Sequence, residues 1–317
     1  MIKWGIIGLG KIAHKFAEGL TYVANAELYG IASSNRTRAL MFAEKHPVKK
    51  VFDNYEFLAM SEDIDVIYIA SYNHLHAKHV KLCMKHGKHV LCEKPLTTSS
   101  ANTRELFALA QEKKLFLMEA LWTRFLPSIA YLEELVQSGS YGPIKHIDVS
   151  FGFVAPKDPK GRLLNPKLGG GVLFDIGIYP LFLCQLLLGS FQKSEFKVVR
   201  GPGNVDIHTT IKNIYPGAQA TILCSFREQL ANEAIIQFEK ATVILKSMWH
   251  CPTKVILSTN GEEKAEPILW KGNGYNYEAA FVSDLLEKGE ISQEKLSAEF
   301  STELIKQIEE MLNTNSG

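Results

Sequence analysis

A glycine-rich turn near the N-terminus constrains the fold more than any other feature of the chain. The stretch WGIIGLGKIAHKF places Gly8, Gly10 and Ala13 at G-x-G-x-x-A spacing, between a strand pattern and a helix pattern. There Gly8 permits a tight turn, Gly10 lets a pyrophosphate approach the backbone, and Ala13 lets the helix pack on the strand. Its place inside a strand–helix–strand unit predicts dinucleotide binding, with Lys11 and Ile12 as further cofactor contacts.

The two halves of the chain have different patterns, which predict two domains. Residues 1–122 alternate apolar runs with amphipathic helices, as in a doubly wound parallel Rossmann sheet of the α/β class. The strands expected there are residues 3–7, 26–32, 50–52, 66–70, 88–92 and 115–118. Residues 123–317 are rich in strands separated by turn signals, which predicts an α+β substrate-binding domain with an open-faced, mostly antiparallel sheet. Because helices cover one face only, the other face predicts a homo-oligomer.

Composition and charge exclude several classes of function. The net charge of the 317 residues is +1, without a long basic run, so nothing indicates nucleic acid or an anionic membrane as a partner. The longest apolar stretch, LFLCQLLLG, is interrupted by Gln185 and is shorter than the ~20 residues that span a bilayer. The five cysteines form no C-x-x-C pair and lie mostly in apolar runs. We therefore expect reduced thiols in a cytoplasmic protein.

The end of the second predicted strand bears on the choice of dinucleotide. NAD-binding folds usually place an acidic residue there for the ribose 2′-hydroxyl, but this chain has Ser33, Ser34 and Asn35. A carboxylate would repel a 2′-phosphate, whereas hydroxyl groups and the guanidinium of Arg38 can bind it. The pattern favours NADP, with NAD as the alternative. Arg36 and Arg38 also fit the start of a solvent-exposed helix.

The segment HVLCEKPLTTS carries a lysine where the fifth strand ends. Lys94 is expected at the carboxyl edge of the sheet, where open α/β folds bind ligands, and Glu93 beside it is a supporting residue of the cofactor site. In GGGVLFDIGIYPL, Asp175 and Tyr179 are four residues apart and share one helix face. An ammonium group near Tyr179 would lower the pKa of its phenol towards that of a useful base. The alternatives are a solvated Lys94 and a core Tyr179 with a locally bonded hydroxyl group.

The segment NHLHAKH offers three histidines, His74, His76 and His79, as candidate metal ligands. His74 does not share the helical face of the other two, and zinc sites need supporting ligands that this segment lacks. We therefore predict no metal. His76 is expected to face the cofactor, and the other two are expected to be solvated.

Four segments together resemble the Gfo/Idh/MocA oxidoreductase family, in order and over nearly the whole chain. They are GLGKIA, NHLHAKHVKLCMKHGKHVLCEKPL, FLMEALWTRFLP and GGGVLFDIGIYPL. The EALWTRFLP and Asp-Ile-Gly-x-Tyr forms are most similar to the family's trans-dihydrodiol dehydrogenase and NADP-dependent sugar 1-dehydrogenase branch. The resemblance implies a Rossmann domain followed by an open-faced sheet through which two subunits usually pair.

The resemblance also implies roles for single residues. Lys94 matches the lysine of the family's E-K-P motif, Tyr179 its acid/base and Asp175 the acidic member of the same helix. Many relatives have histidine at the position of Tyr179. Asn73 and His76 match an Asn-x-x-His near the nicotinamide. The preceding Ser71–Tyr72 departs from the Thr-Pro of many relatives.

The substrate pocket is expected to take residues from both halves of the chain. Trp122 and Arg124 match the W-T-R segment that borders the family's active site, and Phe153 lies on a long predicted strand. Trp122 also fits a packing role between domains. His208, in VDIHTTI, fits either the cleft or the solvent.

The expected activity is hydride transfer between NADP and a hydroxyl-bearing carbon of a sugar, polyol or trans-dihydrodiol. Tyr179 would exchange the hydroxyl proton, Lys94 would assist it, and Asp175 would orient the network. The alternatives are a glycosidase that oxidises its substrate transiently with bound NAD, and a non-catalytic dinucleotide sensor. The sequence does not identify the substrate, because a few pocket hydrogen bonds decide it.

Overall fold

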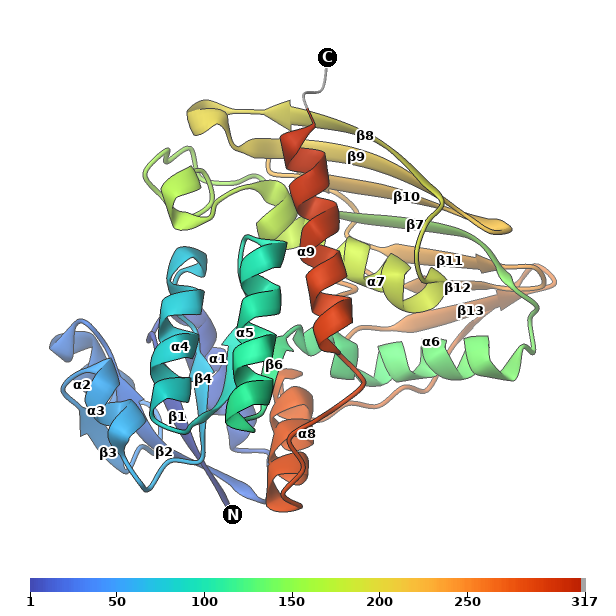
Figure 1. Ribbon diagram of the computed structural model, residues 1–317. Helices are drawn as coiled ribbons and strands as arrows, with labels where there is room; N and C mark the ends of the chain where they lie inside the picture. Colours follow the sequence, from blue (N-terminus) through green and yellow to red (C-terminus); the bar gives the residue numbers. More distant parts are fainter. Residues whose placement is uncertain (315–317) are drawn as a thin grey trace. The chain divides into compact units, whose positions relative to one another are not determined.

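The computed structural model of the protein describes residues 1–314, in two compact units (Figure 1). The first unit holds residues 1–124 and 271–305. The second holds residues 125–270 and 306–314.

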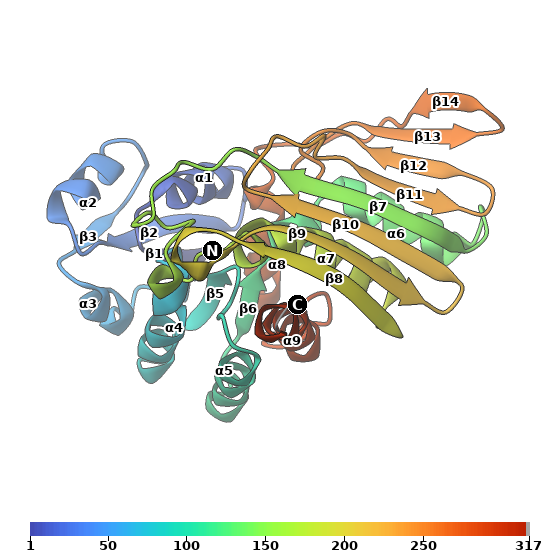
Figure 2. The same cartoon turned by 90° about the horizontal axis from the view of Figure 1, so that it is seen from above.

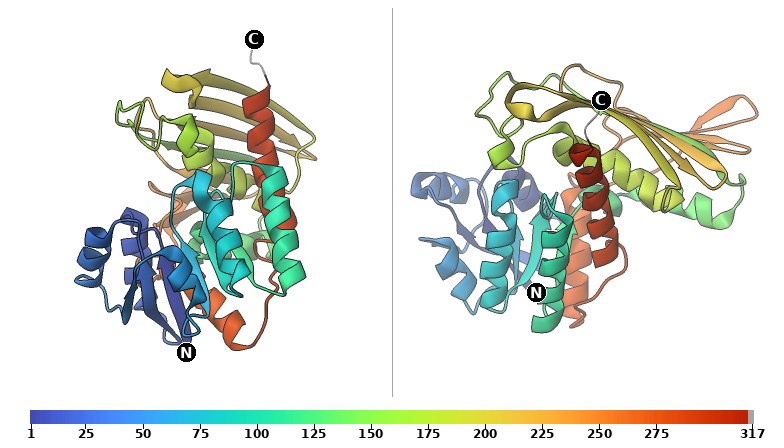
Figure 3. Two further views of the ribbon diagram at one scale, coloured as in Figure 1. Left: turned by 60° about the vertical axis from the view of Figure 1, so that its left-hand side comes forward. Right: turned by 45° about the horizontal axis from the view of Figure 1, so that its top comes forward.

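The first unit is built on a six-stranded parallel sheet with the strand order β3-β2-β1-β4-β5-β6. A parallel sheet covered on both faces needs apolar strands, and each residue of β4, VIYI, is buried. Helices α3, α4 and α5 lie on one face, and α1 and α8 on the other (Figure 3). The elements are β1 (Ile2–Ile7), α1 (Lys11–Leu20), β2 (Ala26–Ala32), α2 (Arg36–Ala43), β3 (Lys50–Phe52), α3 (Tyr55–Met60), β4 (Val66–Ile69), α4 (His76–Lys85), β5 (His89–Glu93), α5 (Ser100–Lys113), β6 (Leu117–Ala120) and α8 (Tyr275–Glu287).

The sequence patterns predict one domain boundary after residue 122, whereas the first unit contains residues 1–124 and also a later part of the chain. Residues 271–305, which the sequence patterns placed in the C-terminal half, return to it and supply α8. The reason is packing, because α8 lies against α1 and β1. The indole N–H of Trp4 donates a hydrogen bond to the hydroxyl group of Ser283 at 3.1 Å.

The second unit contains an eight-stranded sheet in the order β14-β13-β12-β11-β7-β10-β9-β8. The β7–β10 pair is parallel and the other pairs are antiparallel. Helices α6 and α7 lie on one side of this sheet (Figure 2). The elements are α6 (Pro127–Ser138), β7 (Ile144–Gly152), α7 (Ile178–Leu188), β8 (Lys193–Arg200), β9 (Asp206–Tyr215), β10 (Ala218–Ser225), β11 (Ala234–Phe238), β12 (Thr242–Leu245), β13 (Val255–Thr259) and β14 (Glu262–Ala265); α9 (Ala298–Asn313) closes the chain.

A π-helical turn, Leu173–Gly177, precedes α7. With its neighbours it forms the stretch Pro166–Leu188, which is long and apolar enough to cross a membrane, contrary to the expectation from the sequence. About 78% of its most apolar window is buried inside the structure. The segment therefore has the environment of a core helix, and α7 packs on β7 and β10.

Candidate functional site

The turn between β1 and α1 has the geometry of a phosphate cradle. Gly8 has a φ of +86°, and a Cβ atom there would lie 2.8 Å from the carbonyl group of Ala70. A Cβ atom on Gly10 would meet no atom within 4 Å, so the space in front of this residue is open. Among the described residues, no side chain caps α1 at Gly10. The first N–H groups of α1 are therefore available to an anion, as a bound pyrophosphate requires.

The residues that follow Gly10 divide between solvent and core. The side chain of Lys11 is exposed and that of Ile12 is half-buried. Ala13 is fully buried, as expected for the small residue at which helix and strand pack. Lys11 is therefore the member of this group that is free to reach a phosphate.

The segment after β2 contains the serines expected to contact the ribose. Ser33 is buried, and its hydroxyl oxygen accepts a hydrogen bond from the backbone N–H of Asn35 at 3.1 Å. Ser34 is exposed, and its backbone N–H donates to the hydroxyl group of Tyr55 at 3.3 Å. Ser33 therefore shapes the turn, while the Ser34 hydroxyl is on the surface.

The arginines after these serines have different surroundings. Arg36 pairs with Asp53, so its charge is partly compensated. Arg38 is exposed at the start of α2 and lines a surface pocket of about 330 Å³. The other residues of this pocket are His14, Asn35, Thr37, Met41, Phe42 and Lys45. Two cations, Arg38 and Lys45, therefore border one pocket next to the second strand.

The sequence reasoning missed His14 and Lys45. His14 lies one helical turn after Lys11, and Lys45 lies about two turns after Arg38, so helix spacing was the available signal. Nδ1 of His14 and Nε2 of His46 are 2.8 Å apart, and one ring donates to the other. Burial is the main cause that lowers the pKa of both histidines, which favours neutral rings.

The hydrogen-bond partners of His76 could not be predicted from its position in the sequence. It is fully buried, with Nδ1 2.8 Å from the carbonyl oxygen of Pro95 and Nε2 3.0 Å from that of Ser71. The ring thus joins the segment after β5 to the segment after β4. Its neighbour Asn73 is buried at the start of a short 3₁₀ turn.

The expectation that His79 is solvated is wrong. His79 is buried on the inner face of α4, and its Nδ1 lies 2.9 Å from the hydroxyl group of Ser71. Burial, followed by the charges of its neighbours, lowers its pKa to about 4. His74 is exposed, as expected. The described residues hold no cluster of three or more metal-ligating side chains.

Lys94 is half-buried at the end of β5, and the Lys94–Pro95 bond is cis. The backbone N–H of Lys94 donates to the carboxylate of Glu93 at 3.2 Å, and the hydroxyl group of Tyr68 donates to the same carboxylate. Burial raises the pKa of Glu119 and lowers that of His76, and the charge of Lys94 makes a smaller, lowering contribution to the pKa of each. The ammonium group of Lys94 therefore acts on the polar groups that surround this turn.

Trp122 and Arg124 are both buried in the first unit. The indole ring of Trp122 stacks on the ring of Tyr275 from α8, with 4.3 Å between centroids and an angle of 8°. Arg124 donates from Nε to the carbonyl oxygen of Lys295 at 3.1 Å. Both residues thus connect the end of β6 to the returning segment 271–305.

In the second unit, Asp175 lies in the π-helical turn and Tyr179 in the first turn of α7. Asp175 accepts a hydrogen bond from Arg162 at 2.6 Å. π-Helical turns inside α-helices are frequent at functional sites. The sequence reasoning missed Arg162, although it lies in the glycine-rich segment before the helix.

Tyr179 is buried among aromatic rings. Its ring centroid lies 5.8 Å from that of Phe151 and 5.1 Å from that of His250. Phe153, the first residue after β7, is half-buried and packs on Phe226 with 5.3 Å between ring centroids. His208 is half-buried, and its Nδ1 lies 3.1 Å from the hydroxyl group of Ser225.

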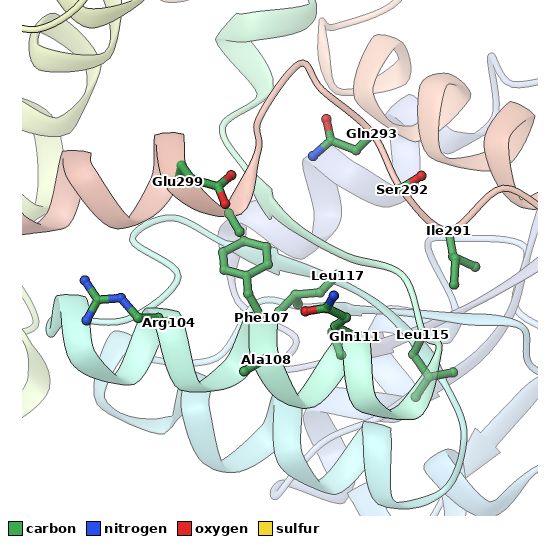
Figure 4. A pocket seen from close by; sticks show the side chains of 12 residues that line it. Arg104, Phe107, Ala108, Gln111, Leu115, Leu117, Ile291, Ser292, Gln293 and Glu299 are labelled. Carbon is green, nitrogen blue, oxygen red and sulfur yellow. The ribbon is translucent and has the colours of Figure 1, made fainter.

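The first unit also has a pocket of about 450 Å³ that none of the predicted site residues line (Figure 4). Phe107 points into it from α5, and Gln293 and Glu299 come from the returning segment. The pocket is separate from the glycine turn and from Lys94. We assign it no part in the candidate site.

Comparisons with known proteins match two successive parts of the chain to one family. Residues 2–121 match the Gfo/Idh/MocA description "Oxidoreductase family, NAD-binding Rossmann fold", and residues 129–244 match the "GFO/IDH/MocA C-terminal domain". The human trans-1,2-dihydrobenzene-1,2-diol dehydrogenase is 34% identical over 301 residues, which cover 91% of this chain and 89% of that protein. The Xenopus laevis enzyme is 35% identical, with 90% of each chain covered.

Solved structures share the whole fold. The aldose-aldose oxidoreductase of Caulobacter crescentus, complexed with glycerol, has a TM-score of 0.88 at 22% identity and covers 98% of this chain and 96% of its own. A 3-ketoreductase of Actinomadura kijaniata, in complex with NADP and TDP-benzene, has a TM-score of 0.85 at 24% identity, with 97% and 96% covered. The chain therefore belongs to the Gfo/Idh/MocA oxidoreductase family.

Proposed function

We propose that this oxidoreductase transfers hydride between NADP and a hydroxyl-bearing carbon of a sugar, polyol or trans-dihydrodiol. The observation that carries the proposal is the turn at Gly8 and Gly10, where one glycine has no room for a Cβ atom and the other faces open space. Such a cradle at an uncapped helix start fits a pyrophosphate. The names of the diol dehydrogenase relatives support the substrate class.

The choice of NADP is supported by charge. Arg38 and Lys45 line one pocket beside the segment after β2, and neither is paired with a carboxylate among the described ion pairs. Ser34 leaves its hydroxyl group exposed on the same segment. Two cations and a hydroxyl group suit a 2′-phosphate better than a free 2′-hydroxyl. The NADP bound to the Actinomadura 3-ketoreductase supports the same choice.

The chemistry proposed for the protein is proton transfer. The nicotinamide supplies the hydride acceptor when it is bound. Tyr179 takes the proton of the substrate hydroxyl group during oxidation and returns it during reduction. The ammonium group of Lys94 favours the phenolate form and so makes Tyr179 a better base. Asp175, held by Arg162, orients a second hydroxyl group of the substrate.

The first experiment measures NADPH absorbance with a panel of aldoses, inositols and cyclic diols. We expect Tyr179→Phe to lower kcat by about 10²–10⁴-fold on the accepted substrate, because general acid–base catalysis contributes that much. The dissociation constant of NADP should remain unchanged. Tyr22→Phe, at an exposed tyrosine, is the matched control. Equal turnover by Tyr179→Phe and the wild type would remove Tyr179 from this role.

The second experiment addresses the cofactor. We expect Arg38→Ala to weaken NADP binding by about tenfold or more and to leave NAD binding unchanged, because it removes a charge-assisted hydrogen bond to the 2′-phosphate. Equal losses for both dinucleotides would contradict the preference for NADP. Nicotinamide that stays bound through purification, without net reduction during turnover, would favour the glycosidase alternative. NADP binding without activity on the panel would favour a sensor.

We also propose that two copies pair through the sheet of the second unit, as the family resemblance implies. One register row crosses all eight strands on the same face. Its members on β8, β9, β10 and β7 are exposed and polar, those on β11, β12 and β13 are half-buried isoleucines, and the alanine on β14 is exposed. The row consists of Glu195, Lys212, Thr221, Asp148, Ile235, Ile244, Ile256 and Ala265. The cytoplasmic location stays a prediction.

A further inference from the structure

Glu278, on α8 of the first unit, is a buried acid without a hydrogen-bond partner. Its side chain is 0% exposed, and neither carboxyl oxygen has a partner among the described residues. An ionised carboxylate in such a place is strongly disfavoured, and a neutral one still carries a desolvation cost. An apolar side chain of similar volume would be more stable there. The residue therefore needs an explanation other than packing.

The surroundings of Glu278 connect it to the segment that carries Lys94. Its carboxyl group interacts with that of Glu93 from β5 and with the phenol of Tyr68 from β4. The ring of Tyr68 in turn stacks on Phe16 of α1, with 3.7 Å between centroids. Glu93 is thus the acid that acts on Glu278.

Glu93 and Glu278 differ in the hydrogen bonds that their carboxyl groups accept. The carboxylate of Glu93 accepts hydrogen bonds from the hydroxyl group of Tyr68 and from the backbone N–H of Lys94. Glu278 has no donor that would stabilise a negative charge. Two neighbouring buried carboxyl groups cannot both ionise at moderate cost. Burial, and then the charge of Glu93, raises the pKa of Glu278 well above its usual range.

We propose that Glu278 holds a proton beside the ionised Glu93 and thereby positions Lys94. In this arrangement Glu93 keeps one negative charge, which binds the Lys94 backbone, and Glu278 adds none. Loss of the proton would place a second negative charge beside Glu93, whose carboxylate accepts the backbone N–H of Lys94, and would alter the position of Lys94. Glu278 is thus a positioning residue. Its effect on turnover rests on the proposed function, in which Lys94 assists Tyr179.

The first test needs no activity. Free energies of unfolding in urea are measured from pH 5 to pH 9 for the wild type and for Glu278→Gln. Above the pKa of an unfolded-state glutamate, near 4.5, the unfolded wild type releases the proton that the folded state keeps. The wild type therefore loses stability relative to Glu278→Gln as the pH rises towards the folded-state pKa of Glu278.

The matched control is Glu112→Gln, at an exposed glutamate on α5. We expect its stability to follow that of the wild type at every pH. A constant difference between Glu278→Gln and the wild type from pH 5 to pH 9 would overturn the proposal, because it would mean that Glu278 does not keep a proton in the folded protein.

The second test uses turnover on the substrate found by the NADPH panel. We expect Glu278→Leu to lower kcat by about tenfold, the effect usual for loss of a residue that supports a reactive group. The dissociation constant of NADP should stay within about twofold of the wild-type value. Glu278→Gln, which keeps the shape of a protonated carboxyl group, should recover most of the loss and shift the alkaline limb of the kcat profile. Equal kcat profiles for Glu278→Leu and the wild type would refute the positioning role. If no substrate is found, the proposed function fails, and the urea experiment still decides where the proton resides.

Discussion

At the scale of single residues, buried histidines tie together the two segments that follow β4 and β5. Each ring nitrogen of His76 lies against a backbone carbonyl oxygen, and a neutral ring can donate to only one of them. His79 lies one turn further along α4 and bonds the side chain of Ser71. A side chain that is bonded and buried in this way should affect stability when it titrates.

His79 gives a prediction with a defined pH window. Its pKa is about 4 in the folded protein and near 6.5 in the unfolded chain. As the pH falls from 6.5 to 4, the unfolded chain takes up a proton that the folded protein refuses, so the folded state loses stability. We expect the urea midpoint of His79→Gln to fall less steeply over this window than that of the wild type.

The charged groups that face His79 are His76 and Lys78 on α4 and His74 just before it, and all three lower its pKa. His74→Gln, at an exposed position, is the control and should keep the wild-type slope. Parallel pH profiles for His79→Gln and the wild type would show that His79 does not stay neutral in this range.

The sequence predicted those residues whose type is dictated by backbone geometry. Gly8 was singled out from the G-x-G-x-x-A spacing, and the structure has a turn there without room for a Cβ atom; Lys94 was expected where the fifth strand ends, and it directly follows β5. Burial of polar side chains is set by tertiary contacts, which spacing does not reveal. His79 was therefore expected in solvent, and Glu278 was missed although it is a lone charge in the run YNYEAAFV.

At the scale of elements, the helix that carries Asp175 and Tyr179 begins at an unusual cap. The buried carboxylate of Asp206, from β9, accepts the backbone N–H of Leu173 at 2.7 Å. Gly171 precedes it with a φ of +128°, and a Cβ atom there would lie 2.1 Å from the Asp206 carboxylate. A side chain from a distant strand thus fixes the start of the helix, in place of a local cap.

We expect Asp206→Ala to lower the free energy of unfolding by about 1–2 kcal/mol, the usual cost of a lost cap. Because the helix start would loosen, kcat should also fall, whereas NADP binding by the first unit should not change. Asp206→Asn keeps one acceptor oxygen, so its free energy of unfolding and its kcat should fall less than those of Asp206→Ala. Asp148→Ala, at an exposed position on β7 of the same sheet, is the control. An unaltered unfolding curve for Asp206→Ala would contradict a capping role.

The expected strands of the first unit agree with the observed ones to within two residues at each end. Buried parallel strands need apolar runs, so pattern and structure coincide there. The return of α8 to this unit was not foreseen, because an amphipathic helix does not specify which sheet it covers. The π-helical turn at Leu173–Gly177 also has no sequence signal that separates it from α-helix.

At the scale of the whole molecule, the sheet of the second unit has one face whose character changes along its register row. Ile235, Ile244 and Ile256 are half-buried neighbours on β11, β12 and β13. Asp148 and Thr221 continue the row into a polar region. A stable homodimer needs an apolar contact area bordered by polar groups, and the row supplies an apolar part on β11, β12 and β13 next to a polar part on β7 and β10.

Ile244 lies at the middle of the apolar part, so a charge there would be buried without a partner in the dimer. We expect Ile244→Lys to convert a dimer of 35.5 kDa chains into monomers at micromolar concentration, as measured by analytical ultracentrifugation. Gln192→Lys adds the same charge at an exposed position before β8 and should leave the dimer intact. A wild-type monomer over the whole concentration range, or an Ile244→Lys dimer as tight as the wild type, would mean that this face does not join two copies.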